Sequence, residues 1–195
     1  MPRISKQAVR PRVAPVEPPY DHETAAALDA LGPPIMLFRT FARRPARARA
    51  IVGWGGYTLS RRFTLSLRQR ELVIDRTTSL CGADYEWGVH IAVFAEKAAL
   101  TAEQIQSLAI GNPDDPCWTD PADRAVLCAV DALHHHHDLA DAQWQSLVEA
   151  VGDDGAVDLL LLAGWYHAIS FAAKALRLPL EPGTPALPAK PRRSQ

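Results

Sequence analysis

The chain has 195 residues, of which 48% are hydrophobic and 22% are charged, so it has enough apolar material for one domain with a core. A formal net charge of −1 gives no electrostatic reason to expect nucleic acid or an anionic membrane as a partner. Three cysteines without a Cys-x-x-Cys pair argue against a disulfide framework and against a zinc module. We recognise neither a secretory signal nor an uninterrupted apolar run of membrane-spanning length, so we expect a soluble, cytoplasmic protein.

The prolines gather toward both ends of the chain. Residues 1–20 are rich in proline and have few apolar anchors, so we expect an N-terminal arm in extended geometry. Residues 179–195 have a similar composition and are expected to form a C-terminal tail. Between them, residues 21–178 are expected to fold as one helical domain.

Three short helices are predicted in the first part of this domain. Residues 22–31 have a helical composition and stop at Gly32, which two prolines follow. Residues 35–42 and 46–59 give two further helical runs, which Pro45 separates.

Side chains that can cap a helix precede three predicted helices in the middle of the chain. A Ser or Thr followed three residues later by Gln forms a capping box, and an Asp can cap a helix by itself. The predicted caps are Ser66 with Gln69 before residues 67–80, Asp84 before residues 85–99, and Thr101 with Gln104 before residues 102–109.

The last part of the domain is also helical by its pattern. Asp120, with proline as the next residue, predicts the start of a helix that runs to about residue 135. Residues 142–151 give another helix that ends at Gly152, and residues 155–176 give a long apolar one. No segment has the convincing alternation of a strand, so the predicted fold class is all-α.

Glu86 and His90 stand in the segment that looks most like a chemical site. Residues four apart lie on one face of a helix about one turn apart, so this carboxylate and imidazole can share a proton. Aromatic and apolar neighbours would partly desolvate the pair and shift the pKa values of both groups. The alternative is an exposed pair that adds only about a few tenths of a kcal/mol to helix stability.

The segment around this pair resembles the carboxymuconolactone decarboxylase family, which includes alkyl hydroperoxidase D. The residues that carry the resemblance are Glu71 and His90 with their spacing, then Tyr85, Glu86 and Trp87, and then Ala95, Leu100 and Thr101. The layout matches over roughly residues 35–180, whereas specific motif content is confined to residues 70–105. The resemblance implies a single-domain helical bundle of the alkyl hydroperoxidase D type.

The resemblance also implies which residues carry the chemistry. In the peroxidase branch a Cys-x-x-Cys pair before the histidine performs the redox reaction, and the matching positions here are Ala83 and Glu86. Cys81 lies two residues too early to form the short-range disulfide of that cycle. We therefore expect the decarboxylase-like branch, with Glu86 and His90 as catalytic residues. Glu71 is the third candidate, because the matching glutamate in the peroxidase branch belongs to a proton relay; its alternative role is a structural ion pair.

Four further residues are candidates for the wall of a substrate pocket: Tyr85, Trp87, Cys81 and His167. Tyr85 and Trp87 could each be pocket wall or core, and of the two Tyr85 is better able to reach a substrate, through its hydroxyl. Cys81 could be a reactive thiol or a small core residue. His167 could line the pocket from the last long helix or be a satisfied core histidine.

Four consecutive histidines, residues 134–137, stand at the end of a predicted helix. Consecutive residues on a helix point in different directions, so the run lacks the i,i+4 pair that holds a metal on one face. We expect a solvated helix end and no metal site.

Taken with the resemblance, these residues predict an acid/base enzyme of lyase or hydrolase type that needs no cofactor. Its expected substrate is a small organic acid, a lactone or a related carbonyl compound. The resemblance also implies a homo-oligomer, a trimer or a hexamer. Neither nucleic acid nor a membrane is an expected partner. Two alternatives stay open: a peroxidase like alkyl hydroperoxidase D, and a non-catalytic helical binding module.

Overall fold

The structure, a computed structural model, describes residues 10–189. This part of the chain contains α-helices joined by loops and has no β-strand, which confirms the predicted all-α class. The helices are α1 (His22–Leu31), α2 (Met36–Phe41), α3 (Pro45–Thr58), α4 (Leu67–Leu80), α5 (Asp84–Phe94), α6 (Ala102–Ile110), α7 (Pro121–His136) and α8 (Asp141–Leu176). The outer ends of the predicted arm and tail, residues 1–9 and 190–195, lie outside the described residues.

Most of the predicted capping residues begin helices as expected. Ser66 accepts the backbone N–H of Gln69 at 3.2 Å, and the Gln69 side chain accepts the backbone N–H of Ser66 at 3.0 Å, which completes the capping box of α4. Thr101 and Gln104 form the same reciprocal pair at α6. Asp120 caps α7 by accepting a backbone N–H two residues later at 2.9 Å.

Asp84 does not cap α5 as predicted. The helix begins at Asp84 itself, after Ala83, and ends at Phe94, so it is shorter than the predicted helix over residues 85–99. The Asp84 carboxylate instead accepts the backbone N–H of Leu187 in the C-terminal segment. A tertiary contact thus replaces the local cap.

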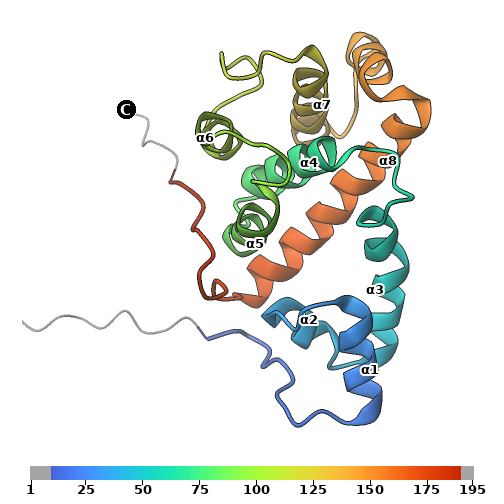
Figure 1. Ribbon diagram of the computed structural model, residues 1–195, viewed down its shortest axis with the longest axis vertical. Helices are drawn as coiled ribbons and strands as arrows, with labels where there is room; N and C mark the ends of the chain where they lie inside the picture. Colours follow the sequence, from blue (N-terminus) through green and yellow to red (C-terminus); the bar gives the residue numbers. More distant parts are fainter. Residues whose placement is uncertain (1–9, 190–195) are drawn as a thin grey trace, which may run out of the picture.

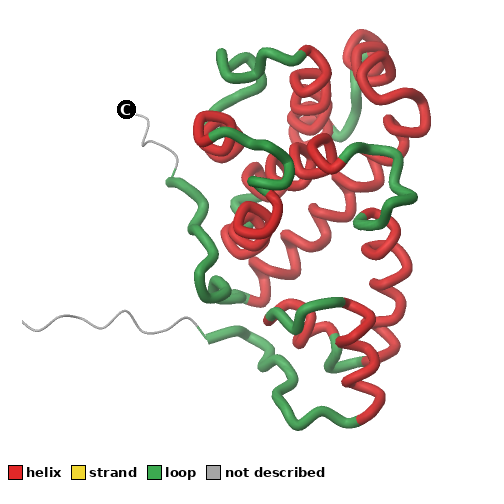
Figure 2. The backbone as a smooth tube through the Cα atoms, in the orientation of Figure 1, coloured by secondary structure: helices red, strands yellow, loops and turns green. Residues whose placement is uncertain are grey.

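Helix α4 lies at the centre of the main bundle. It packs against α5, α6, α7 and α8, and Leu72, Val73 and Ile74 in its middle are fully buried. Helices α1, α2 and α3 pack together as a second group, and α8 runs diagonally between this group and the main bundle (Figure 1). Figure 2 shows that the helices are joined by loops and differ widely in length, and α8 is the longest of the described helices.

Helix α8 is interrupted at Gly152. The φ of 74° and ψ of 170° at this residue are not helical, and a positive φ is adopted freely only by glycine because it has no Cβ. The helices predicted over residues 142–151 and 155–176 are therefore two arms of one bent α8. The predicted break at Gly152 is confirmed.

Both extended ends pack on the helical domain along their described residues. Arg12 makes two hydrogen bonds with backbone carbonyls at the end of α8. In the C-terminal segment, Glu181 accepts the hydroxyl of Tyr85 at 2.6 Å. The Pro185 backbone passes so close to Gly88 that a Cβ there would lie 2.4 Å from its carbonyl oxygen. Only glycine fits at this crossing of the tail over α5.

Among the described helices, α8 alone has the length and hydropathy of a membrane span, with a mean hydropathy of 1.4 over its most apolar window. Half of that window is buried against the rest of the protein. A core helix of a soluble protein has the same properties, so this is weak evidence for a membrane span.

Candidate active site

Glu71 of α4 and His90 of α5 meet in the protein interior. Nδ1 of His90 lies 2.8 Å from Oε2 of Glu71, and the two side chains are 6% and 0% exposed. Because a carboxylate can only accept, Nδ1 carries the proton of the neutral ring, and Nε2 holds its lone pair. Arg70 donates to the other oxygen of Glu71 at 3.1 Å, so the carboxylate is held from two sides.

The second ring nitrogen of His90 faces Tyr166 of α8. The hydroxyl lies 3.0 Å from Nε2, and the two rings meet edge to face at 5.1 Å between centroids. Burial raises the pKa of Tyr166 well above its ordinary value, so the hydroxyl keeps its proton and donates it to Nε2. Glu71, His90 and Tyr166 therefore form a buried relay of hydrogen bonds across α4, α5 and α8.

Glu86 stands next to this relay without joining it. Its Oε1 lies 3.7 Å from Nε2 of His90, which is beyond hydrogen-bond distance. Its Oε2 is buried and has no partner. Burial raises the pKa of Glu86, and the charge of His90 opposes this only in part. A carboxyl group in such a position can hold a proton and donate it to a bound molecule.

Asp75 of α4 adds a further buried acid to the surroundings of His90. Burial raises the pKa of Asp75 well above its ordinary value, and one of its oxygens has no partner. Burial alone would lower the pKa of His90, but the hydrogen bond and charge of Glu71, with the charges of Glu86 and Asp75, outweigh burial and raise it. Such a cluster of perturbed groups is typical of a site that moves protons.

An apolar cavity of about 320 Å³ opens beside the relay. Glu86, His90 and Tyr166 contribute its ionisable side chains, and no Lys or Arg of the described residues lines it. Its apolar wall comes from α1, α2, α3, α5 and α8, including Leu31, Leu37, Phe41, Val52, Phe94, Trp165 and Ile169. The arrangement places a proton-transfer group at a mostly apolar cavity that can hold a small molecule.

The structure places Tyr85 and Trp87 in the core rather than in the cavity wall. The Tyr85 hydroxyl donates to Glu181 and accepts the backbone N–H of Leu37 at 3.1 Å, so it anchors the C-terminal segment and α2. Trp87 is 2% exposed, and its indole N–H is buried without a partner. Neither residue lines the cavity beside His90.

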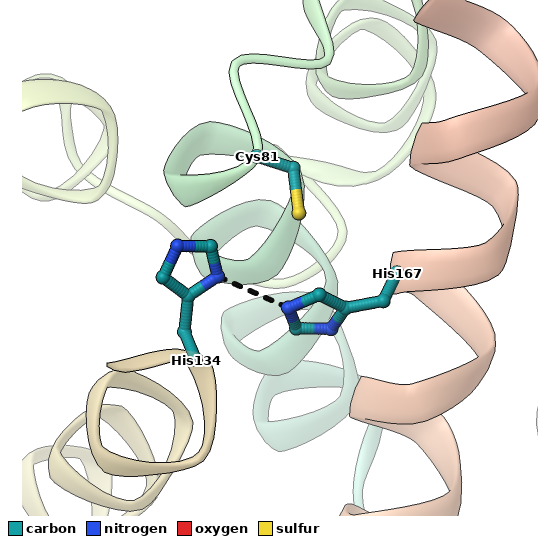
Figure 3. A group of neighbouring side chains, drawn as sticks. All are labelled: Cys81, His134 and His167. Atoms are coloured by element: carbon teal, nitrogen blue, oxygen red, sulfur yellow. Dashed lines mark hydrogen bonds between the residues drawn. The ribbon is translucent and has the colours of Figure 1, made fainter. Parts of the chain in front are cut away.

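Cys81 and His167 also lie away from that cavity, but they lie close to each other. Nε2 of His167 is 3.0 Å from Nδ1 of His134, and the Cys81 thiol points at the same pair of rings (Figure 3). His134 is the first of the four consecutive histidines and is half-buried, whereas residues 135–137 are exposed. The expected solvated helix end thus applies to three of the four histidines.

Tyr166 and Asp75 were not predicted as site residues. Both lie in apolar helical stretches, and no sequence motif marks either of them. The burial of Tyr166 could have been predicted from the helical period, because Tyr166 lies on the same face of α8 as the buried residues Leu159, Leu162 and Ile169. No comparable signal was available for Asp75, whose burial depends on the helices that pack around α4.

Comparison with known proteins identifies a family that part of the chain resembles. The sequence profile of the carboxymuconolactone decarboxylase family matches residues 45–131, a range that includes Glu71, Glu86 and His90. The matched stretch, which is less than half of the chain, resembles the carboxymuconolactone decarboxylase family. The predicted resemblance is therefore confirmed, and Tyr166 lies outside the matched range. No curated protein matches the chain.

A solved structure supports the fold assignment. The chain is similar to the debrominase Bmp8, whose structure was determined as a Cys-to-Ala variant in complex with 2,3,4-tribromopyrrole. The TM-score is 0.65 at 14% sequence identity, and the alignment covers 88% of this chain and 92% of the other. This likeness shows that the two proteins share a helical fold.

Proposed function

We propose that this protein, which resembles the carboxymuconolactone decarboxylase family, is an acid/base enzyme that needs no cofactor and acts on a small, largely apolar carbonyl compound or lactone. The observation that carries the proposal is the buried relay of Glu71, His90 and Tyr166, which meets Glu86 at an apolar cavity of about 320 Å³. Cavities of this kind, with few polar groups in an apolar wall, are the usual form of small-molecule sites.

The proposed reaction begins with proton transfer at carbon. Neutral His90 has its lone pair on Nε2 and can take a proton from the carbon next to a substrate carbonyl. Glu71 accepts the hydrogen bond from Nδ1 and stabilises the imidazolium that forms. Protonated Glu86 donates a hydrogen bond to the oxygen that becomes an enolate, and the dry surroundings strengthen this bond. The imidazolium then returns its proton to carbon.

The cavity favours a neutral substrate over a carboxylic acid. A bound carboxylate would need a cationic partner, because burying an unpaired charge is costly. The described residues that line the cavity include no Lys or Arg, and the guanidinium of Arg70, beside the relay, is already bonded to Glu71. Lactones and ketones therefore fit the cavity better than organic acids do.

A peroxidase of this family would need cysteine thiols at the cavity, and no cysteine of the described residues lines it. Ala83 and Glu86 occupy the positions of the family's cysteine pair, and none of Cys81, Cys117 and Cys128 lines the cavity. Glu86 and Asp75 each have a buried oxygen without a hydrogen-bond partner, which lowers the stability of the fold. A non-catalytic binding module would not need these carboxyl groups, so it does not explain this cost. Both observations support acid/base catalysis.

The proposal can be tested before the natural substrate is known. Cyclic ketones and lactones that fit the cavity are incubated with the protein in D₂O, and exchange of the proton next to the carbonyl is followed by NMR. We expect catalysed exchange with at least one compound, and a loss of roughly 100-fold or more in His90→Gln because general base catalysis contributes that much. Glu103→Gln, a change on the exposed first turn of α6, is the control. Exchange that His90→Gln leaves unchanged would refute the proposal.

We also propose that the protein is a cytoplasmic homo-oligomer, a trimer or hexamer, formed through α8. The exposed face of its second arm repeats apolar or small residues at alternating spacings of four and three: Val157, Leu161, Gly164, Ala168, Phe171 and Ala175. This is the spacing of a helix seam that packs against another helix. A Cβ at Gly164 would meet no atom within 4 Å, so the middle of the face is open to close approach.

A further inference from the structure

Cys81, His134 and His167 come from three different helices and converge on one point. Cys81 follows the last turn of α4, His134 lies in the last turn of α7, and His167 lies in the second arm of α8 (Figure 3). The thiol sulfur and one nitrogen of each ring all lie within 4.8 Å of one another. We propose that these three side chains form a zinc-binding site that is separate from the proton relay.

The spacing of the donor atoms suits a tetrahedral ion. Zinc binds imidazole nitrogen at about 2.0–2.1 Å and thiolate sulfur at about 2.3 Å, which places the ligand atoms roughly 3.3 to 3.6 Å apart. Nδ1 of His134 and Nε2 of His167 are already 3.0 Å apart. Side-chain rotations of small size therefore bring all three atoms to their places around one ion.

His167 is already oriented as a ligand. Its Nδ1 lies 2.8 Å from the carbonyl oxygen of Ala163, and because a carbonyl only accepts, Nδ1 carries the proton. The lone pair is therefore on Nε2, the atom that faces His134 and Cys81. A histidine whose other nitrogen donates to a backbone carbonyl is the usual arrangement at a protein-bound metal. His134 becomes a ligand when its single proton resides on Nε2 instead of Nδ1.

Burial raises the pKa of the Cys81 thiol, and two groups beside it oppose this effect and can stabilise a metal-bound thiolate. The Lys174 ammonium donates to the carbonyl of Cys81 and brings a positive charge close to the sulfur. The hydroxyl of Ser170 is fully buried and makes no hydrogen bond, yet it lies near Cys81 and can donate to a negative sulfur. All three candidate ligands are partly accessible to solvent, so water can fill the fourth position.

The proposed site and the relay use different sides of α8. Tyr166 and His167 are neighbours in sequence, but Tyr166 turns toward His90 and His167 turns toward His134. None of the three proposed ligands lines the cavity beside His90. Binding of the ion would fasten α4, α7 and α8 together without occupying the proposed catalytic centre.

Cobalt(II) is the probe for the test, because it takes the place of zinc and is coloured. The protein, without an affinity tag, is reduced, freed of metal and titrated with Co²⁺ while its absorption spectrum is recorded. We expect one ion per chain, visible bands of tetrahedral intensity, and a near-ultraviolet band from the thiolate bond. Addition of Zn²⁺ should abolish these bands and raise the thermal unfolding midpoint.

Variants separate this site from loose binding to the histidine run. Cys81→Ser should abolish the thiolate band and weaken Zn²⁺ binding by roughly 100-fold or more, since even outer-shell changes cost about 10- to 100-fold. His167→Gln should weaken it similarly. The matched controls are Cys128→Ser and a variant with His135, His136 and His137 changed to Ala, both of which should keep the spectrum. Binding without a thiolate band, or binding lost in the three-histidine control but kept in Cys81→Ser, would overturn the proposal.

Discussion

The Tyr166 hydroxyl lies 3.0 Å from Nε2 of His90, so the last long helix reaches the atom that we assign as the catalytic base. This contact couples α8 to the residues of the family-matched segment, which ends before α8 begins. It also defines the neutral tautomer of His90, because the hydroxyl donates to Nε2 while Nδ1 donates to Glu71.

Removal of this hydroxyl is the first prediction. Tyr166→Phe should lower the free energy of unfolding by about 1 kcal/mol, the net value of one buried hydrogen bond. It should also slow the proton exchange described above by about 10-fold if the bond contributes about 1.4 kcal/mol in the transition state. Tyr57→Phe is the matched control, because its hydroxyl bonds Asp158 at 3.0 Å outside the cavity. An equal loss of activity in both variants would remove Tyr166 from the relay.

The buried acid Asp75 should make the protein less stable as the pH rises. Burial raises the pKa of Asp75 in the folded protein above its pKa in the unfolded chain, which is about 3.9. The protonated carboxyl therefore contributes its full stability at pH values below the unfolded-state pKa, and this contribution is lost as the pH rises toward the folded-state pKa. The pKa values of Glu86 and His90 are also raised, so these groups act in the same direction. Urea unfolding of the wild type should therefore give smaller free energies at neutral pH than at mildly acidic pH.

The substitution Asp75→Asn tests the origin of this pH dependence. It removes a carboxyl that is 1% exposed, so the decline of stability with pH should be smaller than in the wild type. Asp141→Asn, at an exposed position in the first turn of α8, makes the same change of charge without burial. If the two variants follow the same pH curve, Asp75 is not the source.

The apolar face of α8 predicts an assembly larger than the 21.3 kDa chain. Leu161→Glu should shift the protein toward a monomer in sedimentation velocity, because a charge in the seam would be buried without a partner. Trp144→Glu, on the first arm of α8 before Gly152, should leave the assembly intact. A wild type that sediments as a monomer at micromolar concentration would contradict the proposed oligomer.

Replacing Arg76 by alanine should lower the free energy of unfolding by a large amount. Its guanidinium holds Asp131 with two bonds of 2.6 and 2.7 Å and also donates to backbone carbonyls around the end of α6. Arg76→Ala would leave these acceptors buried without a donor, so we expect a loss of about 3–5 kcal/mol in urea unfolding. Arg49→Ala breaks an exposed pair with Glu23 and should cost about 1 kcal/mol or less.

The absence of thiols from the cavity predicts no peroxidase activity. The reduced wild-type protein, incubated with an alkyl hydroperoxide and a dithiol, should consume peroxide no faster than the reductant alone. Peroxide loss is followed over time, with Cys81→Ser measured in parallel. Turnover in the wild type that disappears in Cys81→Ser would replace the acid/base assignment with thiol chemistry.

Much of the helical framework was determined locally by the sequence. The caps at Ser66, Thr101 and Asp120 satisfy backbone groups of their own helices, and Gly152 supplies a positive φ where the helix must bend. Such features need no distant partner, so they could be predicted. The spacing of Glu71 and His90 was equally visible, because both belong to one continuous stretch of chain.

Tertiary structure decided the rest of the site. Asp84 does not cap α5, because its carboxylate accepts the backbone N–H of Leu187, about a hundred residues away in the C-terminal segment. The Tyr85 hydroxyl binds Glu181 and does not line the cavity. His167 and Tyr166 were separated by the rotation of about 100° between successive helical residues, which sent one to His134 and the other to His90. Which side of α8 meets which neighbour depends on packing among several helices, and no local pattern in the sequence contains that information.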